Sequence, residues 1–309
     1  MAGVTTGIAA AIGLRWAVDD VSMLFDVPPV ANFQMVPAPS VAQVIEKHFA
    51  WADQQQAAGI APQLAPIHEF FAEAQRGTRA FAEDALNFDS KWRYVQDFLV
   101  GGNKHRAYLE ERFAARVFAT DQLETTVRYA VQAYLDHLNR VDQALLVNLK
   151  ADLENVPASA FSAEVDRQAV EQSMRAAVQQ AVRAVESGTP GMVGREILSW
   201  VAGEVLAEAS IKLATSAGIL GVGASSGAVT FGAGIVLSLV VDTAVSWAYD
   251  EIFDPAGALG QELNVTLARL EALILQGDGE NPGLYARLND YAARRSQARN
   301  AAIKRVVLP

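Results

Sequence analysis

The sequence predicts an all-α protein, an elongated helical bundle that contains a hydrophobic, glycine-rich helical hairpin. Three observations support this fold class. Apolar residues recur at spacings of three and four between proline and glycine breaks. The same stretches are rich in Ala, Glu, Gln and Arg, which favour helices. No run alternates apolar and polar residues between hairpin turns, as a credible sheet requires.

The breaks divide the 309 residues into five regions. We expect an N-terminal apolar segment with a Pro-rich linker, an aromatic-rich helical region, long amphipathic helices, a hydrophobic helical hairpin, and C-terminal helices with a basic end. In that order, the regions are expected at residues 1–39, 40–118, 119–190, 191–253 and 254–309.

The N-terminal apolar stretch, residues 7–14, does not have the pattern of a secretory signal peptide. It lacks a basic region before it, it is followed at once by Arg15, and no convincing cleavage site precedes Asp19 and Asp20. We therefore expect synthesis in the cytoplasm without a secretory signal. The protein is then membrane-associated, or soluble until it inserts or is delivered by a non-classical route.

Ser40 and Gln43 form a capping-box pattern that predicts a helix from this point to about Ala58. The region from about residue 64 to 118 is rich in aromatic residues, which we expect to form ordinary helical core. These residues are Phe70, Phe71, Phe81, Phe88, Trp92, Phe98, Phe113 and Phe118.

A long amphipathic helix is predicted from Asp121, with Glu124 completing its cap. Its apolar positions are Val127, Val131, Tyr134, Leu138, Val141, Leu145, Leu149 and Leu153. At 1.5 Å per residue this helix would span roughly 50 Å. Further helices are predicted at about residues 161–186, 259–275 and 284–307.

Residues 213–241 form a run of 29 residues without Asp, Glu, Lys, Arg or His. Twelve of them are Leu, Ile, Val or Phe, and 17 are Gly, Ala, Ser or Thr. An uncharged run beyond about 18 residues indicates a membrane span, and small residues at helical spacing, such as Gly223 and Gly227, let helices approach closely in lipid. The expected inserting and packing residues are Gly218, Gly221, Gly223, Gly227, Gly232, Gly234, Phe231, Leu237 and Val240.

The turn-forming residues between 218 and 227 predict two helical arms, at about residues 195–220 and 228–249. Each arm would be roughly 33 to 39 Å long, enough to cross a hydrocarbon core of about 30 Å. Trp200, Trp247 and Tyr249 would then lie at one level, as interfacial aromatic residues do.

The two arms differ in charge. The second arm has nine large apolar residues against Asp242 alone, so it can insert. The first arm should not insert alone, because its charged residues cost roughly 8 kcal/mol at the bilayer centre. Its residues Glu196, Glu204, Glu208 and Lys212 form a polar stripe at spacings of four and eight. Several copies in a ring would give this stripe an aqueous lumen.

These features indicate a membrane-inserting helical protein, pore-forming or membrane-disrupting, whose hairpin inserts while the long helices assemble or shield it. The arrangement resembles the α-helical pore-forming proteins, such as colicin-type domains and the long-helix bacterial toxins. The resemblance is architectural, covers residues 195–249 with their flanking helices, and transfers no functional residue. A constitutive hairpin-anchored membrane protein, or a soluble helical scaffold or cargo interaction protein with the hairpin as core, are the alternatives.

The expected partners are a lipid membrane and a second copy of the chain or another helical protein. Nucleic acid is not expected, because the net charge is −10. A C-terminal block from Asn281 has six Lys or Arg against one Asp, a local excess that anionic lipid or an acidic partner would suit, although a solvated helix face also explains it.

We expect no enzyme, no catalytic residue, no cofactor and no metal site. The chain has no cysteine, and its four histidines lie far apart. His68 and Glu69 begin like a zincin motif, but Ala72 stands where the second histidine belongs. The glycines from Gly221 lack the strand context of a dinucleotide fingerprint, and the residues before Lys104 lack a Walker A pattern.

Overall fold

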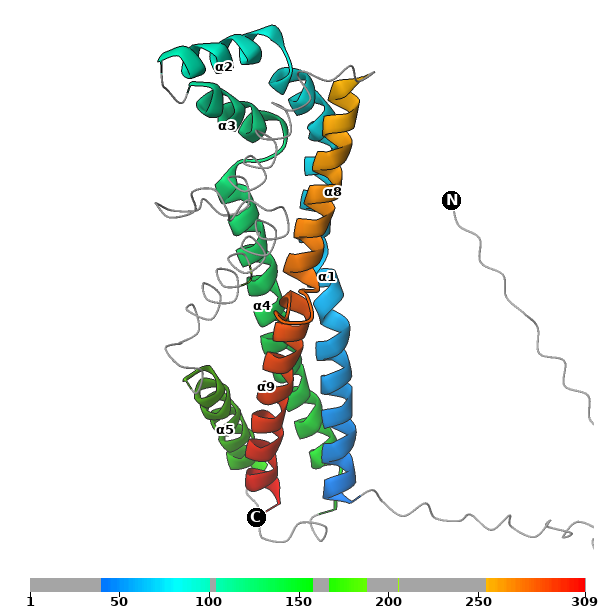
Figure 1. The fold of residues 1–309 in the computed structure, drawn as a ribbon. Coiled ribbons are helices and arrows are strands. Elements are labelled where there is room, and N and C mark those ends of the chain that lie inside the picture. Colours follow the sequence, from blue (N-terminus) through cyan, green and yellow to red (C-terminus); the bar gives the residue numbers. More distant parts are fainter. Residues whose placement is uncertain (1–39, 101–103, 158–166, 188–204, 206–253, 309) are drawn as a thin grey trace, which may run out of the picture. The chain divides into compact units, whose positions relative to one another are not determined.

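The structure, a computed structural model, describes residues 40–100, 104–157, 167–187, 205 and 254–308. All of these belong to one unit, Pro39–Pro309. Nearly all described residues are helical, and their only β-type pairing is an isolated bridge between Gly277 and Pro282. The predicted all-α helical bundle is confirmed for this part of the chain (Figure 1). The predicted hairpin, apart from Val205, lies outside the described residues.

Helix α1, Val41–Ala85, begins with the predicted capping box. The Gln43 amide donates to the Ser40 hydroxyl oxygen at 3.3 Å, and the Ser40 amide donates to the Gln43 side-chain oxygen at 2.9 Å. These two bonds satisfy amide groups that a helix start leaves without partners.

The predicted end of this helix near Ala58 is wrong, because α1 continues through Pro62 and Pro66. A proline inside a helix costs about 3 kcal/mol. Large apolar side chains on both sides of Pro62, including Ile60 and Leu64, are buried against the neighbouring helices, and each such burial contributes about 1.5–3 kcal/mol. Tertiary packing therefore offsets the two breaks.

Two short helices follow, α2, Phe88–Val100, and α3, Lys104–Arg116. They pack against each other, and α3 also packs against α1. The aromatic residues of this region largely form core, as expected. Phe71, Phe81, Phe113 and Phe118 are buried and meet in edge-on or tilted ring contacts, together with the partly buried Phe70. The exceptions are Phe88 and Trp92 of α2, which are exposed.

Helix α4, Thr120–Glu154, matches the long amphipathic helix that the periodicity predicts. Its cap differs from the prediction, because Gln122 and not Glu124 reaches back, accepting from the Ala119 amide at 2.9 Å. Glu124 instead pairs with Arg128 one turn later. Helix α5, Arg167–Ser187, ends as predicted, and its predicted first residues from 161 lie outside the described part.

Helices α8, Pro255–Leu275, and α9, Leu284–Val307, lie close to the predicted ranges. The Asp254 carboxylate caps α8 by accepting from the Gly257 amide at 3.0 Å. Between the two helices Gly277 adopts φ 77°, a left-handed conformation that glycine takes without strain. This glycine ends α8 and lets the chain continue into α9.

The long helices run antiparallel to α1. Residue pairs show the register: His48 meets Asp152 of α4, and Thr78 meets Asn264 of α8. α5 packs against α9 and, near Lys150 and Glu171, against α4. Figure 1 shows α4 running along α1, while α8 and α9 follow each other along α1, with α8 beside its second half and α9 beside its first.

Two apolar clusters fill the bundle. The first joins α1 from Ile60 onward with α3, α4 as far as Leu138, α8 and the start of α9. The second joins the start of α1 with the last part of α4, α5 and the end of α9. Among the described helices, none is both long and apolar enough for a membrane crossing.

Candidate functional site: a buried charged layer

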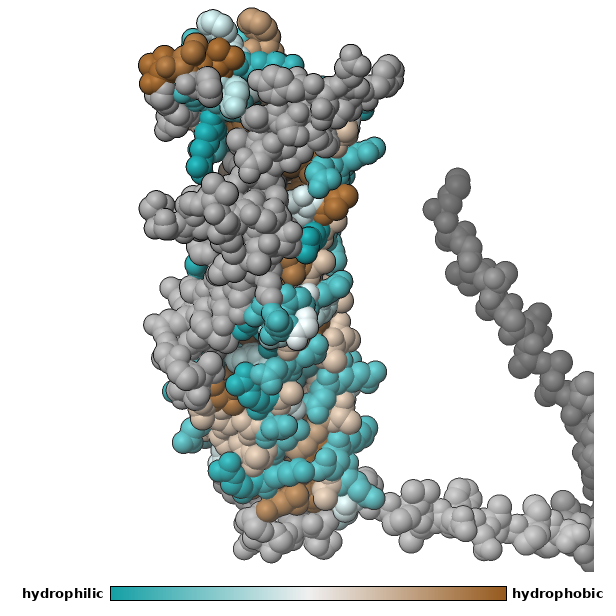
Figure 2. Space-filling view, in the orientation of Figure 1, coloured by the Kyte–Doolittle hydropathy of each residue, from teal (hydrophilic) through white to brown (hydrophobic). Residues whose placement is uncertain are grey.

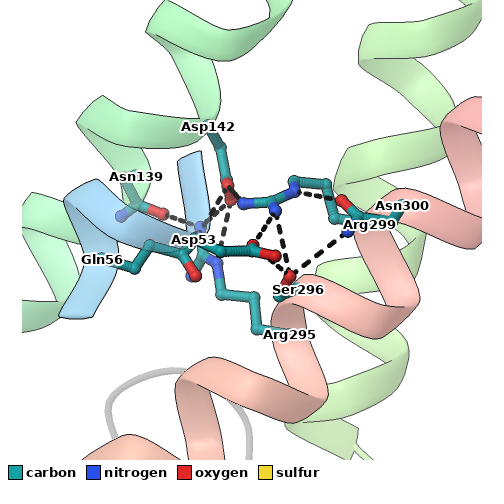
Figure 3. Close-up of polar contacts among 8 residues, drawn as sticks. All are labelled: Asp53, Gln56, Asn139, Asp142, Arg295, Ser296, Arg299 and Asn300. Carbon is teal, nitrogen blue, oxygen red and sulfur yellow. Dashed lines mark hydrogen bonds and ion pairs between the residues drawn. The ribbon is translucent and has the colours of Figure 1, made fainter. Parts of the chain in front are cut away.

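A layer of polar side chains separates the two apolar clusters. α1, α4 and α9 each contribute residues to it. On α1 and α9 these residues lie between the positions that enter the first cluster and those that enter the second, and on α4 they lie next to Leu138 of the first cluster and Val141 of the second. We call this group the charged layer. It consists of Asp53, Gln56, Asn139, Asp142, Arg295, Ser296, Arg299 and Asn300 (Figure 3).

Asp142 of α4 is the centre of the layer. Its Oδ2 accepts from Nε and Nη2 of Arg295 at 2.9 and 2.7 Å. Its Oδ1 accepts from Nη1 of Arg299 at 2.9 Å and from the Gln56 amide at 3.4 Å. Both carboxylate oxygens are therefore occupied by donors from two other helices.

Asp53 of α1 completes the charge balance. Its Oδ1 accepts from Nη2 of Arg299 at 2.7 Å and from the Ser296 hydroxyl. The Arg299 side chain is 0% exposed, whereas that of Asp53 is 48% exposed. Two carboxylates thus balance two guanidinium groups, and the layer meets solvent at Asp53 and at Asn139.

The layer is electrostatically satisfied. Burial alone would lower the pKa of Arg295, but attraction to the Asp142 carboxylate and hydrogen bonds to Asp142 and Tyr291 raise it overall. Burial raises the pKa of Tyr291, although Arg295 opposes that shift. At neutral pH the guanidinium is therefore charged and the phenol is protonated, which is the combination that the hydrogen bonds require.

Close packing beside the layer fixes its position along the helices. The Tyr134 hydroxyl donates to the Gln56 carbonyl at 3.3 Å, and Nε2 of His137 lies 2.9 Å from the Gln55 carbonyl oxygen. At Gly59 a Cβ would come 2.1 Å from Nε2 of His137, so the position of the His137 ring against α1 depends on glycine here.

This arrangement holds helices together. The Ser296 hydroxyl donates to the Asp53 carboxylate, and every polar side chain of the layer has a protein partner. Within the described helices, no group of His, Asp and Glu is placed to hold a metal ion. Charges that pair only in one register can specify that register, as buried polar residues do in coiled coils.

The residues predicted to act in the membrane all lie outside the described residues. They are the packing residues between Gly218 and Val240, the stripe Glu196, Glu204, Glu208 and Lys212, and the aromatic residues Trp200, Trp247 and Tyr249.

The basic C-terminal block differs from a binding surface for anions. Arg295 and Arg299 are buried in the charged layer, Arg294 pairs with Asp290, and Lys304 pairs with Glu46 of α1. Arg295 and Arg299 are therefore compensated inside the bundle, and Arg294 and Lys304 on its surface. Of the four histidines, His48 and His105 are buried, His137 is partly exposed and His68 is exposed.

The sequence contains a signal for the charged layer that the interpretation of the C-terminal block missed. Arg295 follows Tyr291 by four residues on the apolar seam of α9, and Asp142 follows Leu138 by four on that of α4. A charge on the apolar seam of each of two helices predicts that they pair. No protein-family model, curated protein or solved structure matches the chain.

Proposed function

We propose that this protein acts by inserting residues 213–241 into a lipid bilayer, with the helical bundle as the body that carries and shields this segment. The observation that supports the proposal most is the uncharged run of 29 residues, attached at both ends to one bundle. Such a run is long enough for the hydrocarbon core, which needs about 20 residues per helical crossing.

The two attachments limit how the segment can cross. On one side it follows α5, which packs against α9, and on the other the described chain resumes at Asp254, which forms an ion pair with Arg79 of α1 at 3.5 Å. A segment that leaves and rejoins the same bundle crosses a bilayer an even number of times. This supports a hairpin with arms at about residues 195–220 and 228–249 rather than a single span.

The charged layer supports a bundle that can open. Its buried charges regain hydration when the helices separate, so they hold the bundle closed less strongly than apolar residues of the same volume would. In the proposed mechanism α1, α4 and α9 part at this layer, and the segment is released to lipid. The long helices then assemble with those of further copies.

Leakage of a trapped dye from liposomes, measured across pH and lipid composition, tests this function. Dye release that depends on the protein supports insertion. Intact liposomes under all conditions would contradict it. Recovery of the protein from membranes only with detergent would instead favour a constitutive hairpin anchor.

The polar stripe tests whether insertion forms a pore. If Glu204 and Glu208 line a water-filled lumen, changing both to Gln should keep lipid binding but lower the preference for cations, because rings of carboxylates concentrate cations. Reversal potentials of single channels under a salt gradient measure this preference. Identical selectivity of the two proteins would show that the stripe does not line the lumen.

A soluble helical scaffold is the second candidate, and one observation favours it. Val205, which lies only eight residues before the uncharged run, is 2% exposed and belongs to the first apolar cluster. Chain close to the run therefore contributes to the core. In a scaffold the run would remain in the protein, and vesicles would leave its environment unchanged.

A further inference from the structure

Helix α2 presents an apolar face to the surface. Phe88, Trp92, Val95 and Leu99 follow one another at spacings of four, three and four, so they share one side of the helix. They are 79%, 54%, 42% and 73% exposed. Figure 2 shows the hydrophobic colour gathered over α2. A contiguous exposed apolar surface of this kind marks an interaction site. Elsewhere the exposed large apolar residues of the described part are Tyr129, Val147, Val265 and Leu308.

Polar contacts on the opposite side of α2 hold this face outward. Ser90 is fully buried, and its Oγ lies 3.0 Å from Nε2 of His105 on α3. The Asp97 carboxylate accepts from the His105 amide at 2.7 Å, and the Tyr94 ring meets the His105 ring edge-on at 5.5 Å. Rotating the apolar face toward α3 would break these contacts and leave buried polar groups without partners.

We infer that α2 lies flat in the surface of an anionic lipid bilayer, with its apolar face toward the acyl chains. This inference rests on the proposed membrane function and assigns a second contact to it. The helix has 13 residues, which corresponds to about 20 Å and is too short for a bilayer core of about 30 Å. Phe88 and Trp92 are of the residue types that bind at the boundary between headgroups and acyl chains.

The charge of the α2–α3 region favours lipid over an apolar protein partner. Residues 88–116 contain six Lys or Arg and four Asp or Glu, a local excess of two positive charges on a chain of net charge −10. At about 100° per residue, Lys91 lies about 70° from the centre of the apolar face, and Asp97 lies nearly opposite it. Lys91 can extend its ammonium group to the headgroups, and exposed Lys104 on α3 adds to the attraction, whereas Arg106 is paired with Glu110.

The position of α2 connects this contact with the inserting segment. Asp254, where the described chain resumes after residues 206–253, is paired with Arg79 near the end of α1, and α2 begins nine residues after Arg79. Lipid contact through α2 therefore brings the returning end of that segment to the bilayer. Docking at the surface would precede insertion.

The absence of cysteine allows a direct test with single labels. Val95→Cys carries a polarity-sensitive dye on the apolar face, Val147→Cys carries it on an exposed apolar position of α4, and Leu237→Cys reports on the uncharged run. Each full-length protein is mixed with vesicles of zwitterionic lipid, or with vesicles that also contain anionic lipid.

The dye at position 95 is expected to shift to the blue with anionic vesicles, more weakly with zwitterionic ones, and less as salt is added. The dye at position 147 should not respond. Trp92→Glu should weaken vesicle binding on the order of tenfold or more, since it removes a large apolar side chain from the contact. Val265→Glu, at an isolated exposed position of α8, should leave binding unchanged.

The labels separate failure of this inference from failure of the proposed function. A shift at position 237 without one at 95 would overturn the role of α2 and leave insertion standing. A shift at 95 without one at 237 would support α2 and contradict insertion, and no shift at either would contradict both. An apolar signal at 95 before vesicles are added would show that a second copy or residues 188–253 cover the face, and would overturn the lipid assignment.

Discussion

The charged layer predicts that Asp142→Asn will destabilise the bundle severely. The change removes the negative charge that faces two buried guanidinium groups and leaves only the half-exposed Asp53 to balance them. Breaking a buried ion pair by removing one partner costs about 3–5 kcal/mol. For a domain of this size that corresponds to a fall in Tm on the order of 6–20 °C.

Thermal and urea unfolding, followed by the helical circular dichroism signal, measure this loss. The matched control is Asp136→Asn on the same helix, where the carboxylate is exposed and accepts from Gln132 at 2.9 Å. An exposed substitution of this kind changes stability by about 0.5 kcal/mol or less. Equal effects of the two substitutions would refute the layer as a buried, charge-balanced unit.

Replacing the whole buried group distinguishes a lost charge partner from lost packing. In the variant Asp142→Leu, Arg295→Met and Arg299→Met no buried charge is left unpaired, so most of the stability lost in Asp142→Asn should return. If the layer also eases opening of the bundle, this variant should release liposome contents more slowly than the wild type. Release at the wild-type rate would show that the layer does not ease the proposed opening of the bundle.

Two further predictions concern α2 and the glycines of the uncharged run. Burial lowers the pKa of His105 below its usual 6.5, although Asp97 opposes the shift. The contribution of neutral His105 to stability is therefore complete above about pH 6.5. It is lost as pH falls through the lowered folded-state pKa. The rate of amide exchange in α2, corrected for intrinsic rates, should therefore rise between pH 7 and 5. The variant His105→Asn should show a smaller rise. The same rise in both proteins would argue against protonation of His105 as the cause. Gly227→Leu should weaken crosslinked assembly or thermal stability more than Val236→Leu, because a large side chain separates helices that pack through glycine. Equal behaviour of the two variants would count against close packing through the small residues of this run.

Helix positions were predictable where the local sequence decides them. The end of α8 follows from Gly277, the start of α9 follows from Gly283, and the start of α1 follows from the reciprocal bonds of Ser40 and Gln43. The continuation of α1 through Pro62 was not predictable, because burial against helices that are distant in sequence offsets the local cost.

The charged layer and the α2 face were harder to predict. Asp142 and Arg295 lie at seam positions, which indicates a buried pair. The two residues are 153 positions apart, however, and the register of the two helices depends on how α4 and α9 pack. Phe88 and Trp92 have the composition of core residues. Their exposure depends on which side of α2 binds α3, and this is decided by the contacts of Ser90 and His105.

The central claim is that residues 213–241 enter the hydrocarbon core of a bilayer. A dye on Leu237→Cys, in vesicles whose lipids carry bromine at known depths of the acyl chain, tests it most directly. Insertion predicts the strongest quenching by bromines deep in the acyl chain and protection from iodide in the water. Unchanged emission with every brominated lipid, together with an environment that is already apolar before vesicles are added, would contradict insertion and identify the run as part of a protein core.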